Sequence, residues 1–243
     1  METPVYTLRR AARNNNPEWW QAENFATAEE GCITHFQKES ETTKPSAVFR
    51  GVYDDDAIML RYEVEGVDAF ASAERRYNGW VYKDSCCEFF VQPPRVNGGY
   101  MNFEVNAAGV LHTSHITDPE RRPNGFKDFR YVTPEDGAKV EIFRWRGCEG
   151  AQPGNETPPC EEVVPNGSTS WGMAIKIPFE VLRAYVGEWR EGEPWRANFY
   201  TCQVEGGPKY FVSWAPIPFF NFHTPQFFGI LKFEGKHGAS CCH

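Results

Sequence analysis

Short runs of strand-forming residues, separated by turn signals, recur along the chain and constrain its fold more than any other feature. The runs are rich in Val, Ile, Phe, Tyr and Trp, which favour β-strands, and Gly, Pro and Asp stand between them. Repeated short strands with turns between them indicate an all-β sandwich or barrel. The predicted strands are Ala47–Tyr53, Ala57–Val64, Cys86–Gln92, Tyr100–Asn106, Lys139–Trp145, Trp171–Ile177, Ala197–Gln203, Tyr210–Trp214 and Gly229–Phe233.

The length of the chain fits a single domain of this kind. It has 243 residues, and single sandwiches commonly reach about 200–250 residues. We therefore predict one all-β domain over residues 1–243, an antiparallel sandwich of immunoglobulin-like or jelly-roll-like type with one or two short helices. Pro178–Tyr185 has the start and apolar spacing of a short helix, and Asp54-Asp55-Asp56 is typical of a hairpin turn. Residues 147–170, rich in Gly, Pro, Glu and Thr, are predicted to be a long inserted loop.

Charge and hydropathy argue against two classes of partner. The net charge of −8 disfavours binding to nucleic acid, and no run approaches the roughly 18 apolar residues of a membrane helix. The N-terminus lacks a secretory signal, so we expect a cytoplasmic protein, or a secreted one from which a signal was removed. The 8 cysteines show no CxxC spacing, and we expect mostly free thiols.

The segment Tyr100–Asn106 is the most informative part of the sequence. Alternation places Tyr100, Asn102, Glu104 and Asn106 on one face of a strand and apolar residues on the other. An ordinary solvated face would explain such a pattern. However, two amides, a carboxylate and a phenol without Lys or Thr suit a ligand rich in hydroxyl groups better.

The segment before it, from Trp80 to Gln92, contains a strand to which the same alternation of faces applies. Glu88 falls on the polar side of its strand and is expected beside Glu104 if the two strands are neighbours. Trp80 and Tyr82 stand in the loop before that strand, where an exposed Trp ring can stack on a sugar; ordinary packing of Trp80 is an equal alternative.

A third segment near the C-terminus combines aromatic rings with prolines. Phe219, Phe220 and Phe222 are candidate platforms on a stiff loop, although capping of the core is expected for one or two of them. His223 has three possible roles, in ligand binding, metal coordination or a bond to a loop carbonyl, of which the last is the commonest.

Four blocks in order resemble a family 9 carbohydrate-binding module. The resemblance implies a non-catalytic sandwich that holds a sugar end between two aromatic rings, here Trp80 and Phe222, with Glu88 as the carboxylate. The blocks, which lie between about Ala47 and Phe233, are Lys83-Asp-Ser-Cys-Cys-Glu-Phe-Phe, Tyr100-Met-Asn-Phe-Glu-Val-Asn-Ala-Ala-Gly, Trp171 to Pro178, and Trp214-Ala-Pro through Phe222-His-Thr-Pro-Gln-Phe-Phe-Gly.

Two departures from the better known relatives refine this expectation. Phe222 stands where the cellulose- and xylan-binding branch typically has Trp, and Glu104 stands where a basic residue is usual. Both disfavour cellulose specificity, and the chain looks closer to a stand-alone bacterial branch linked to polysaccharide metabolism. Calcium is common among the relatives, which leaves a structural calcium ion open, whereas the Asp54 turn lacks EF-hand spacing.

Two other functions stay open at this point. Glu88 and Glu104 are candidates for the paired carboxylates of a glycosidase, which stand about 5–5.5 Å or 6.5–9.5 Å apart. A haem or other cofactor binder on a related DOMON-type sandwich needs a Met and His axial pair, and the chain has only 4 Met. A metal site built on His112, His115 and His223 has no HExxH motif to support it.

The preferred prediction is binding of a mono- or oligosaccharide without catalysis. The candidate ligand-binding residues are Trp80, Tyr82, Lys83, Asp84, Glu88, Tyr100, Asn102, Glu104, Asn106, His115, Tyr200, Phe222 and His223.

Overall fold

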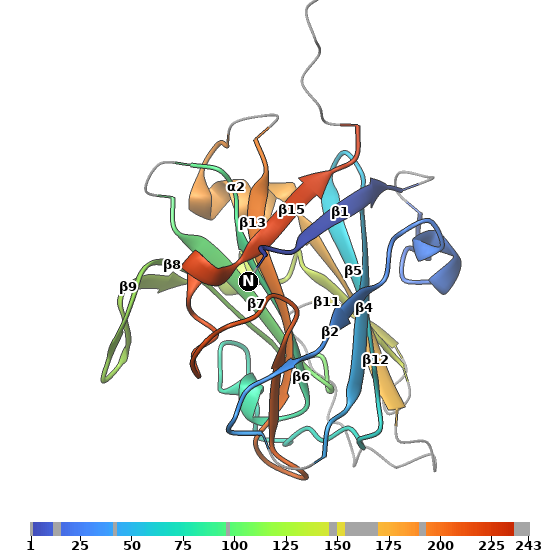
Figure 1. The fold of residues 1–243 in the computed structure, drawn as a ribbon. Helices are drawn as coiled ribbons and strands as arrows, with labels where there is room; N and C mark the ends of the chain where they lie inside the picture. Colours follow the sequence, from blue (N-terminus) through green and yellow to red (C-terminus); the bar gives the residue numbers. More distant parts are fainter. Residues whose placement is uncertain are drawn as a thin grey trace, which may run out of the picture.

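The protein folds into two packed β-sheets with few helices, as seen in a computed structural model (Figure 1). The structure describes residues 2–11, 16–40, 43–95, 98–145, 150–153, 170–189 and 193–235. Its α-helices are α1 (Pro134–Gly137) and α2 (Phe179–Val186), and its 3-10 helices are η1 (Ala22–Phe25), η2 (Val81–Lys83) and η3 (Pro225–Phe227). Its strands are β1 (Val5–Arg10), β2 (Gly31–Ile33), β3 (His35–Phe36), β4 (Ser46–Tyr53), β5 (Ala57–Glu65), β6 (Cys86–Gln92), β7 (Tyr100–Asn106), β8 (Leu111–Arg122), β9 (Gly125–Tyr131), β10 (Glu141–Trp145), β11 (Gly150–Pro153), β12 (Ser170–Pro178), β13 (Trp195–Gln203), β14 (Tyr210–Ser213) and β15 (Gly229–Phe233).

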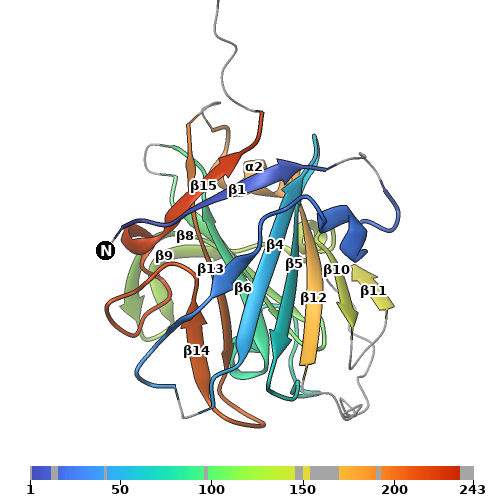
Figure 2. The ribbon, with the colours of Figure 1, turned by 45° about the vertical axis from the view of Figure 1, so that its right-hand side comes forward.

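The strands pair mainly antiparallel in two sheets. Sheet A has the order β1-β15-β13-β6-β7-β8-β9, with β14 on β13 and β3 on β14. Sheet B has the order β11-β10-β12-β5-β4-β1, with β2 on β4, and Figure 2 shows its strands side by side. Strand β1 joins the sheets, because Val5–Leu8 pair in parallel with β15 and Arg9 and Arg10 pair in parallel with β4.

The main hydrophobic core lies between the two sheets. Alternating residues of β6 and β7, such as Phe89 and Phe103, point inward from sheet A, and Leu60 and Ile175 belong to the same core from sheet B. Burial of such side chains is the main source of stability of a sandwich. The other side chains of each strand therefore point to the opposite side of sheet A, called here the outer face.

The outer face of sheet A is covered rather than open. All seven residues of β7 are buried, including Asn102, Glu104 and Asn106, so the polar row predicted from the sequence is not a solvated surface. The segment containing η2 contacts β6, β7 and β13, and Phe222, between β14 and β15, lies on Tyr200 of β13. These two segments explain the burial.

The predicted fold class is confirmed, and the predicted strands all appear, with shifts of at most two residues at their ends. The Asp54 turn joins β4 and β5, where the Asp54 carboxylate accepts the backbone N–H groups of Asp56 and Ala57. The predicted inserted loop over residues 147–170 lies mostly outside the described residues, and its part at Gly150–Pro153 is a strand that pairs with β10. Among the described parts of the chain, no helix has the length and apolar character needed to cross a bilayer.

Candidate functional site

Two carboxyl groups form the centre of the outer face of sheet A. Glu88 on β6 and Glu104 on β7 are directly opposite each other in the strand register, and both are almost fully buried. Within the described residues, neither Oε2 atom has a hydrogen-bond partner, and Glu88 has no ion pair with Lys, Arg or His. Buried charges are normally paired, so two adjacent carboxyl groups with free acceptor atoms are unusual for a purely structural sheet.

The environment of Glu88 raises the pKa of its carboxyl group. Burial raises the pKa of Glu88 well above its ordinary value, and the neighbouring Cys202 and Glu104 act in the same direction. The neutral carboxyl group is thereby favoured, and it offers a hydrogen-bond donor as well as acceptors.

Asn102 fixes the orientation of Glu104. Its amide N–H donates to Glu104 Oε1 over 2.7 Å, while its carbonyl oxygen accepts both the backbone N–H and the hydroxyl group of Ser114 on β8, each over 2.7 Å. The Asn102 carbonyl therefore accepts two bonds within the protein. Oε1 of Glu104 thus accepts one bond within the protein, and Oε2 has no partner among the described residues.

His223 completes the polar group from the segment between β14 and β15. Its Nδ1 lies 2.9 Å from the hydroxyl group of Tyr100, and its Nε2 lies 4.0 Å from Glu104 Oε1, which is beyond a hydrogen bond. Burial lowers the pKa of His223 well below the ordinary value, with a smaller contribution from Arg121, so the ring is neutral near pH 7. A neutral imidazole whose Nε2 makes no hydrogen bond within the described residues can accept from, or donate to, a ligand hydroxyl group.

Two aromatic side chains are exposed at the segment of η2, which contacts β6, β7 and β13. Trp80 comes immediately before η2 and is 65% exposed, so the alternative of ordinary packing does not describe it. The Lys83 ammonium lies 4.8 Å from the centre of the Trp80 ring and pairs with Glu205 over 3.1 Å. Tyr82 is 40% exposed, and its carbonyl oxygen accepts a hydrogen bond from Cys202. An exposed Trp on a short helical turn presents a stacking surface.

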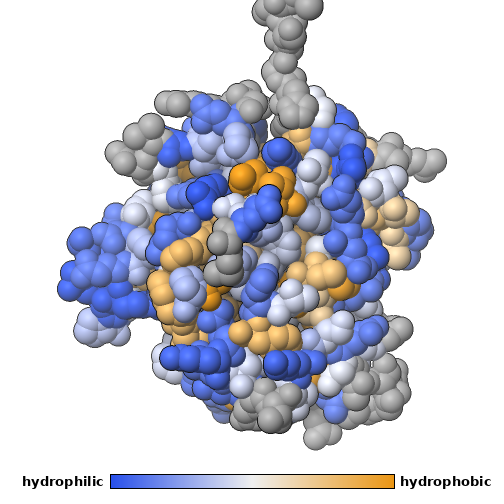
Figure 3. Space-filling view, in the orientation of Figure 1, coloured by the Kyte–Doolittle hydropathy of each residue, from blue (hydrophilic) through white to orange (hydrophobic). Residues whose placement is uncertain are grey.

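The second predicted platform is engaged inside the protein. Phe222 is half-buried and stacks on Tyr200 with ring centres 4.2 Å apart and planes 18° apart, and the Tyr200 hydroxyl group donates to the Phe222 carbonyl. The exposed rings of this segment are Phe219 and Phe220, at 49% and 45% exposure. Figure 3 shows apolar patches among hydrophilic residues on this side of the molecule. Capping by one of the three Phe residues was predicted, and Phe222 has that position.

Asp84 and Asn106 hold the chain segments next to the site in place. Asn106 donates to Asp84 over 2.8 Å and its side-chain oxygen accepts the backbone N–H groups of Ala108 and Val110. Asp84 is fully buried and pairs with Arg75 over 3.1 Å. These contacts fix the turn after β7 and the end of η2 rather than leave groups free for a ligand.

His115 does not join the other predicted site residues. It is opposite Met101 in the register of β7 and β8, so it lies on the core side of sheet A, where its Nε2 lies 2.6 Å from the Gly98 carbonyl oxygen. The prediction of His115 in the site is therefore corrected. His112, three positions earlier, faces Glu104 on the outer face and contacts the Gly79 carbonyl. Alternation along β8 distinguishes the two residues once the register is known.

Calcium takes oxygen ligands, and the carboxylates of the Asp54 turn are already engaged within the protein. Asp54 caps its own turn, and Asp55 pairs with Arg10. Among the described residues, the group of three or more His, Cys, Asp or Glu side chains with donor atoms close together is Cys86, Glu88 and Cys202, which contains two thiols.

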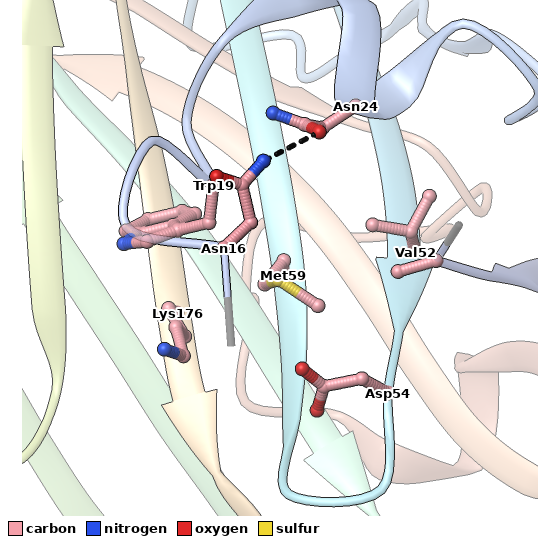
Figure 4. Close-up of a pocket in the computed structure, with 8 residues that line it drawn as sticks. Asn16, Trp19, Asn24, Val52, Asp54, Met59 and Lys176 are labelled. Atoms are coloured by element: carbon pink, nitrogen blue, oxygen red, sulfur yellow. Dashed lines mark hydrogen bonds between the residues drawn. The ribbon is translucent and has the colours of Figure 1, made fainter. Parts of the chain in front are cut away.

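A separate small pocket lies on the outer face of sheet B (Figure 4). Val52, Met59 and Lys176 form its floor, and Trp19 and Asn24 of the N-terminal segment stand over it. Lys176 pairs with Glu141, and Asn24 accepts a bond from Asn16, so its polar groups already have partners. This pocket is on the other sheet from Glu88 and Glu104.

Comparison with known proteins gives a consistent result. A carbohydrate-binding module of family 9 from Caldicellulosiruptor kristjanssonii, solved with cellotriose, matches with a TM-score of 0.57 and 11% identity over 98% of this chain and 97% of its own. The same kind of module solved with glucose has a TM-score of 0.57 and 12% identity over 96% of each chain. A candidate carbohydrate-binding protein from Bacteroides uniformis ATCC 8492 has a TM-score of 0.69 and 26% identity, over 96% of this chain and all of its own.

The family is assigned from a match of the sequence to a family model. No curated protein matches the chain. The model of carbohydrate-binding family 9, however, matches residues 20–132 and 157–233, which is well over half of the length. The resemblance identified from the four sequence blocks is thus confirmed, and the chain belongs to carbohydrate-binding family 9.

Proposed function

We propose that the protein binds a saccharide on the outer face of sheet A and leaves it intact. The observation that carries this proposal is the pair of buried carboxyl groups of Glu88 and Glu104, each with one oxygen that has no partner among the described residues. Sugar hydroxyl groups are suitable donors to such oxygens. The membership in family 9 supports this choice of ligand class.

The surrounding groups suit one sugar residue. His223 Nε2 and Glu104 Oε1 are 4.0 Å apart, a gap that a hydroxyl group can bridge by bonding to both. Trp80 supplies an exposed ring for the C–H face of the sugar. Because Phe222 stacks on Tyr200, we propose that Trp80 is the principal stacking ring and that Phe222 forms the opposite wall.

The first ligands to test follow from the structural neighbours. Modules of the same fold were solved with glucose and with cellotriose, so glucose and cello-oligosaccharides form the starting set. The presence of Phe222 and Glu104 argues for including other sugars, and we propose a glycan array as the second step.

The decisive experiment is calorimetry with each sugar, followed by chromatography of the same mixtures. We expect heat of binding without new products. Glu104→Gln should weaken binding roughly tenfold or more, because replacing a charged acceptor in a buried site costs about 1–3 kcal/mol. Glu141→Gln on sheet B is the matched control and should bind as the parent does.

Two results would refute the proposal. Sugar hydrolysis that disappears in Glu88→Gln would make the protein an enzyme. Unchanged affinity in Glu104→Gln for the ligand that the parent binds would place the site elsewhere, with the surface of Phe219 and Phe220 as the first region to examine.

A further inference from the structure

Two thiols lie beside Glu88 under η2. Cys86 on β6 and Cys202 on β13 are direct neighbours in the strand register, and Glu88 is two positions from Cys86 on the same face. All three side chains are buried, and their donor atoms lie within 4.8 Å of one another. The Cys202 Sγ atom is 3.2 Å from Glu88 Oε1, so the group is already assembled without a ligand.

This group lacks any compensating positive charge. Within the described residues no basic side chain pairs with Glu88, and the residue opposite it on β7 is another acid, Glu104. A cation bound at this group would supply the positive charge that the described residues around Glu88 do not. The sugar-binding proposal accounts for Glu88 Oε2 but gives no role to the two thiols.

We propose that Cys86, Cys202 and Glu88 form a binding site for a thiophilic divalent cation of the Zn²⁺ class. Tetrahedral Zn²⁺ with Zn–S distances of about 2.3 Å and Zn–O distances of about 2.0 Å holds its ligand atoms roughly 3.5 Å apart. The fourth position is left to a water molecule or to the Tyr82 carbonyl oxygen, which lies 3.3 Å from Cys202 Sγ. Two sulfur ligands select Zn²⁺ or Cd²⁺ over Ca²⁺ and Mg²⁺.

Protons leave when the ion binds, because thiolate and carboxylate are the ligand forms. Zn²⁺ replaces one proton on Cys86, one on Cys202 and, where it is protonated, one on Glu88. The affinity for the ion must therefore rise steeply with pH, with two to three protons released for each ion bound.

The other cysteines of the described chain do not belong to this site. Cys87 points to the core side of β6, and Cys32 is exposed on β2. Cys148, Cys160, Cys241 and Cys242 lie outside the described residues. The last two form an adjacent pair next to His243, so they are the natural control for metal binding elsewhere in the chain.

The test uses the full chain, reduced and depleted of metal, without sugar. Zn²⁺ is titrated in a calorimeter in two buffers with different ionisation enthalpies, and Cd²⁺ is followed by its thiolate charge-transfer absorption. We expect one high-affinity ion per chain, release of two to three protons and a higher unfolding temperature. X-ray absorption of the zinc-loaded protein should show two sulfur neighbours per ion.

Variants separate this site from the rest of the chain. Cys202→Ser and Cys86→Ser should each weaken binding at least tenfold, whereas the double change Cys241→Ser with Cys242→Ser should leave the high-affinity site intact. No binding to the reduced parent, a sulfur count other than two, or loss of the signal in the double change alone would each overturn the proposal. The sulfur count needs no variant, so misfolding of a Cys variant does not prevent the test. Because sugar is absent, failure here leaves the saccharide proposal untouched.

Discussion

Acidic side chains on the outer faces of the two sheets differ in the partners they have within the protein. On sheet B, Glu141 pairs with Lys176 over 3.0 Å and accepts a hydrogen bond from the Trp19 indole over 2.8 Å. On sheet A, Glu88 has no basic partner within the described residues and has another carboxyl group, Glu104, as its cross-strand neighbour. The two sites also differ in burial, because the Glu141 side chain is 48% exposed whereas Glu88 is almost fully buried.

This difference supports the proposal that the outer face of sheet A binds the ligand. Paired charges and a bonded indole satisfy their own polar groups and need nothing from outside. Adjacent buried carboxyl groups with free oxygens reduce the stability of the free protein, and a ligand that supplies hydroxyl groups or a cation relieves this. Changes at equivalent positions of the two faces should therefore have opposite consequences.

Substitution of Trp19 and of Trp80 should give the largest contrast between the two faces, in stability and in sugar affinity. Trp19 is buried on sheet B and packs with Trp20, whereas Trp80 is exposed beside sheet A. Trp19→Ala should lower the free energy of unfolding by about 3–5 kcal/mol and leave the affinity for sugar unchanged in the folded fraction. Trp80→Ala should weaken sugar binding by roughly 1–3 kcal/mol, by analogy with stacking of bases on aromatic rings, with a change of less than about 1 kcal/mol in stability.

Chemical denaturation and calorimetry measure the two quantities separately. A large loss of stability in Trp80→Ala would place that ring in the fold rather than in the site. Weaker sugar binding by folded Trp19→Ala would contradict the separation of the two faces.

The two glutamates give a smaller contrast that depends on pH. Because burial raises the pKa of Glu88 above its ordinary value of 4.5, the folded protein binds more protons here than the unfolded chain does. This contribution to stability is present at low pH and is lost as the pH rises from about 4.5 through the folded-state pKa. Glu88→Gln, measured in chelator, should therefore become more stable than the parent by about 1–3 kcal/mol as the pH rises to 7.

Glu141→Gln is the paired control. It removes an exposed ion pair, so it should lower stability by no more than about 1 kcal/mol at pH 7. Free energies of unfolding between pH 4 and 8 test both variants. A Glu88→Gln protein that loses stability relative to the parent as the pH rises would show that the carboxylate has a stabilising partner.

Tyr100→Phe should have the smallest effect. It removes the hydroxyl group that lies 2.9 Å from His223 Nδ1 and leaves the aromatic ring in place. We expect a loss of about 0.5–1.5 kcal/mol in stability, typical of one hydrogen bond, and a severalfold weaker affinity for sugar because the orientation of His223 is less fixed. Unchanged affinity would remove His223 from the site.

The sequence predicted β6 and β7 at the centre of sheet A well, and missed others, among them β8 and β9. Strands β6 and β7 are found because their inward residues are uniformly apolar. Strands β8 and β9 form a hairpin whose outer end is polar on both faces, so periodicity fails there. The Asn124-Gly125 pair in its turn is a strong hairpin signal that was available in the sequence.

The site was predictable only in part for a related reason. Alternation within β7 placed Asn102 and Glu104 together, because it depends on one strand alone. The choice between His112 and His115 depends on the register between β7 and β8, which the sequence does not encode locally. The grouping of Cys202 with Cys86 likewise requires β13 to lie beside β6, although more than 100 residues separate them.

The location of the site is best tested by a crystal structure of the protein with the sugar that gives the strongest binding heat. We expect sugar hydroxyl groups within hydrogen-bond distance of Oε2 of Glu88 and of Glu104, and the sugar ring against Trp80. A sugar bound in the pocket of Trp19 and Lys176, or on Phe219 and Phe220 without contact to either glutamate, would contradict it.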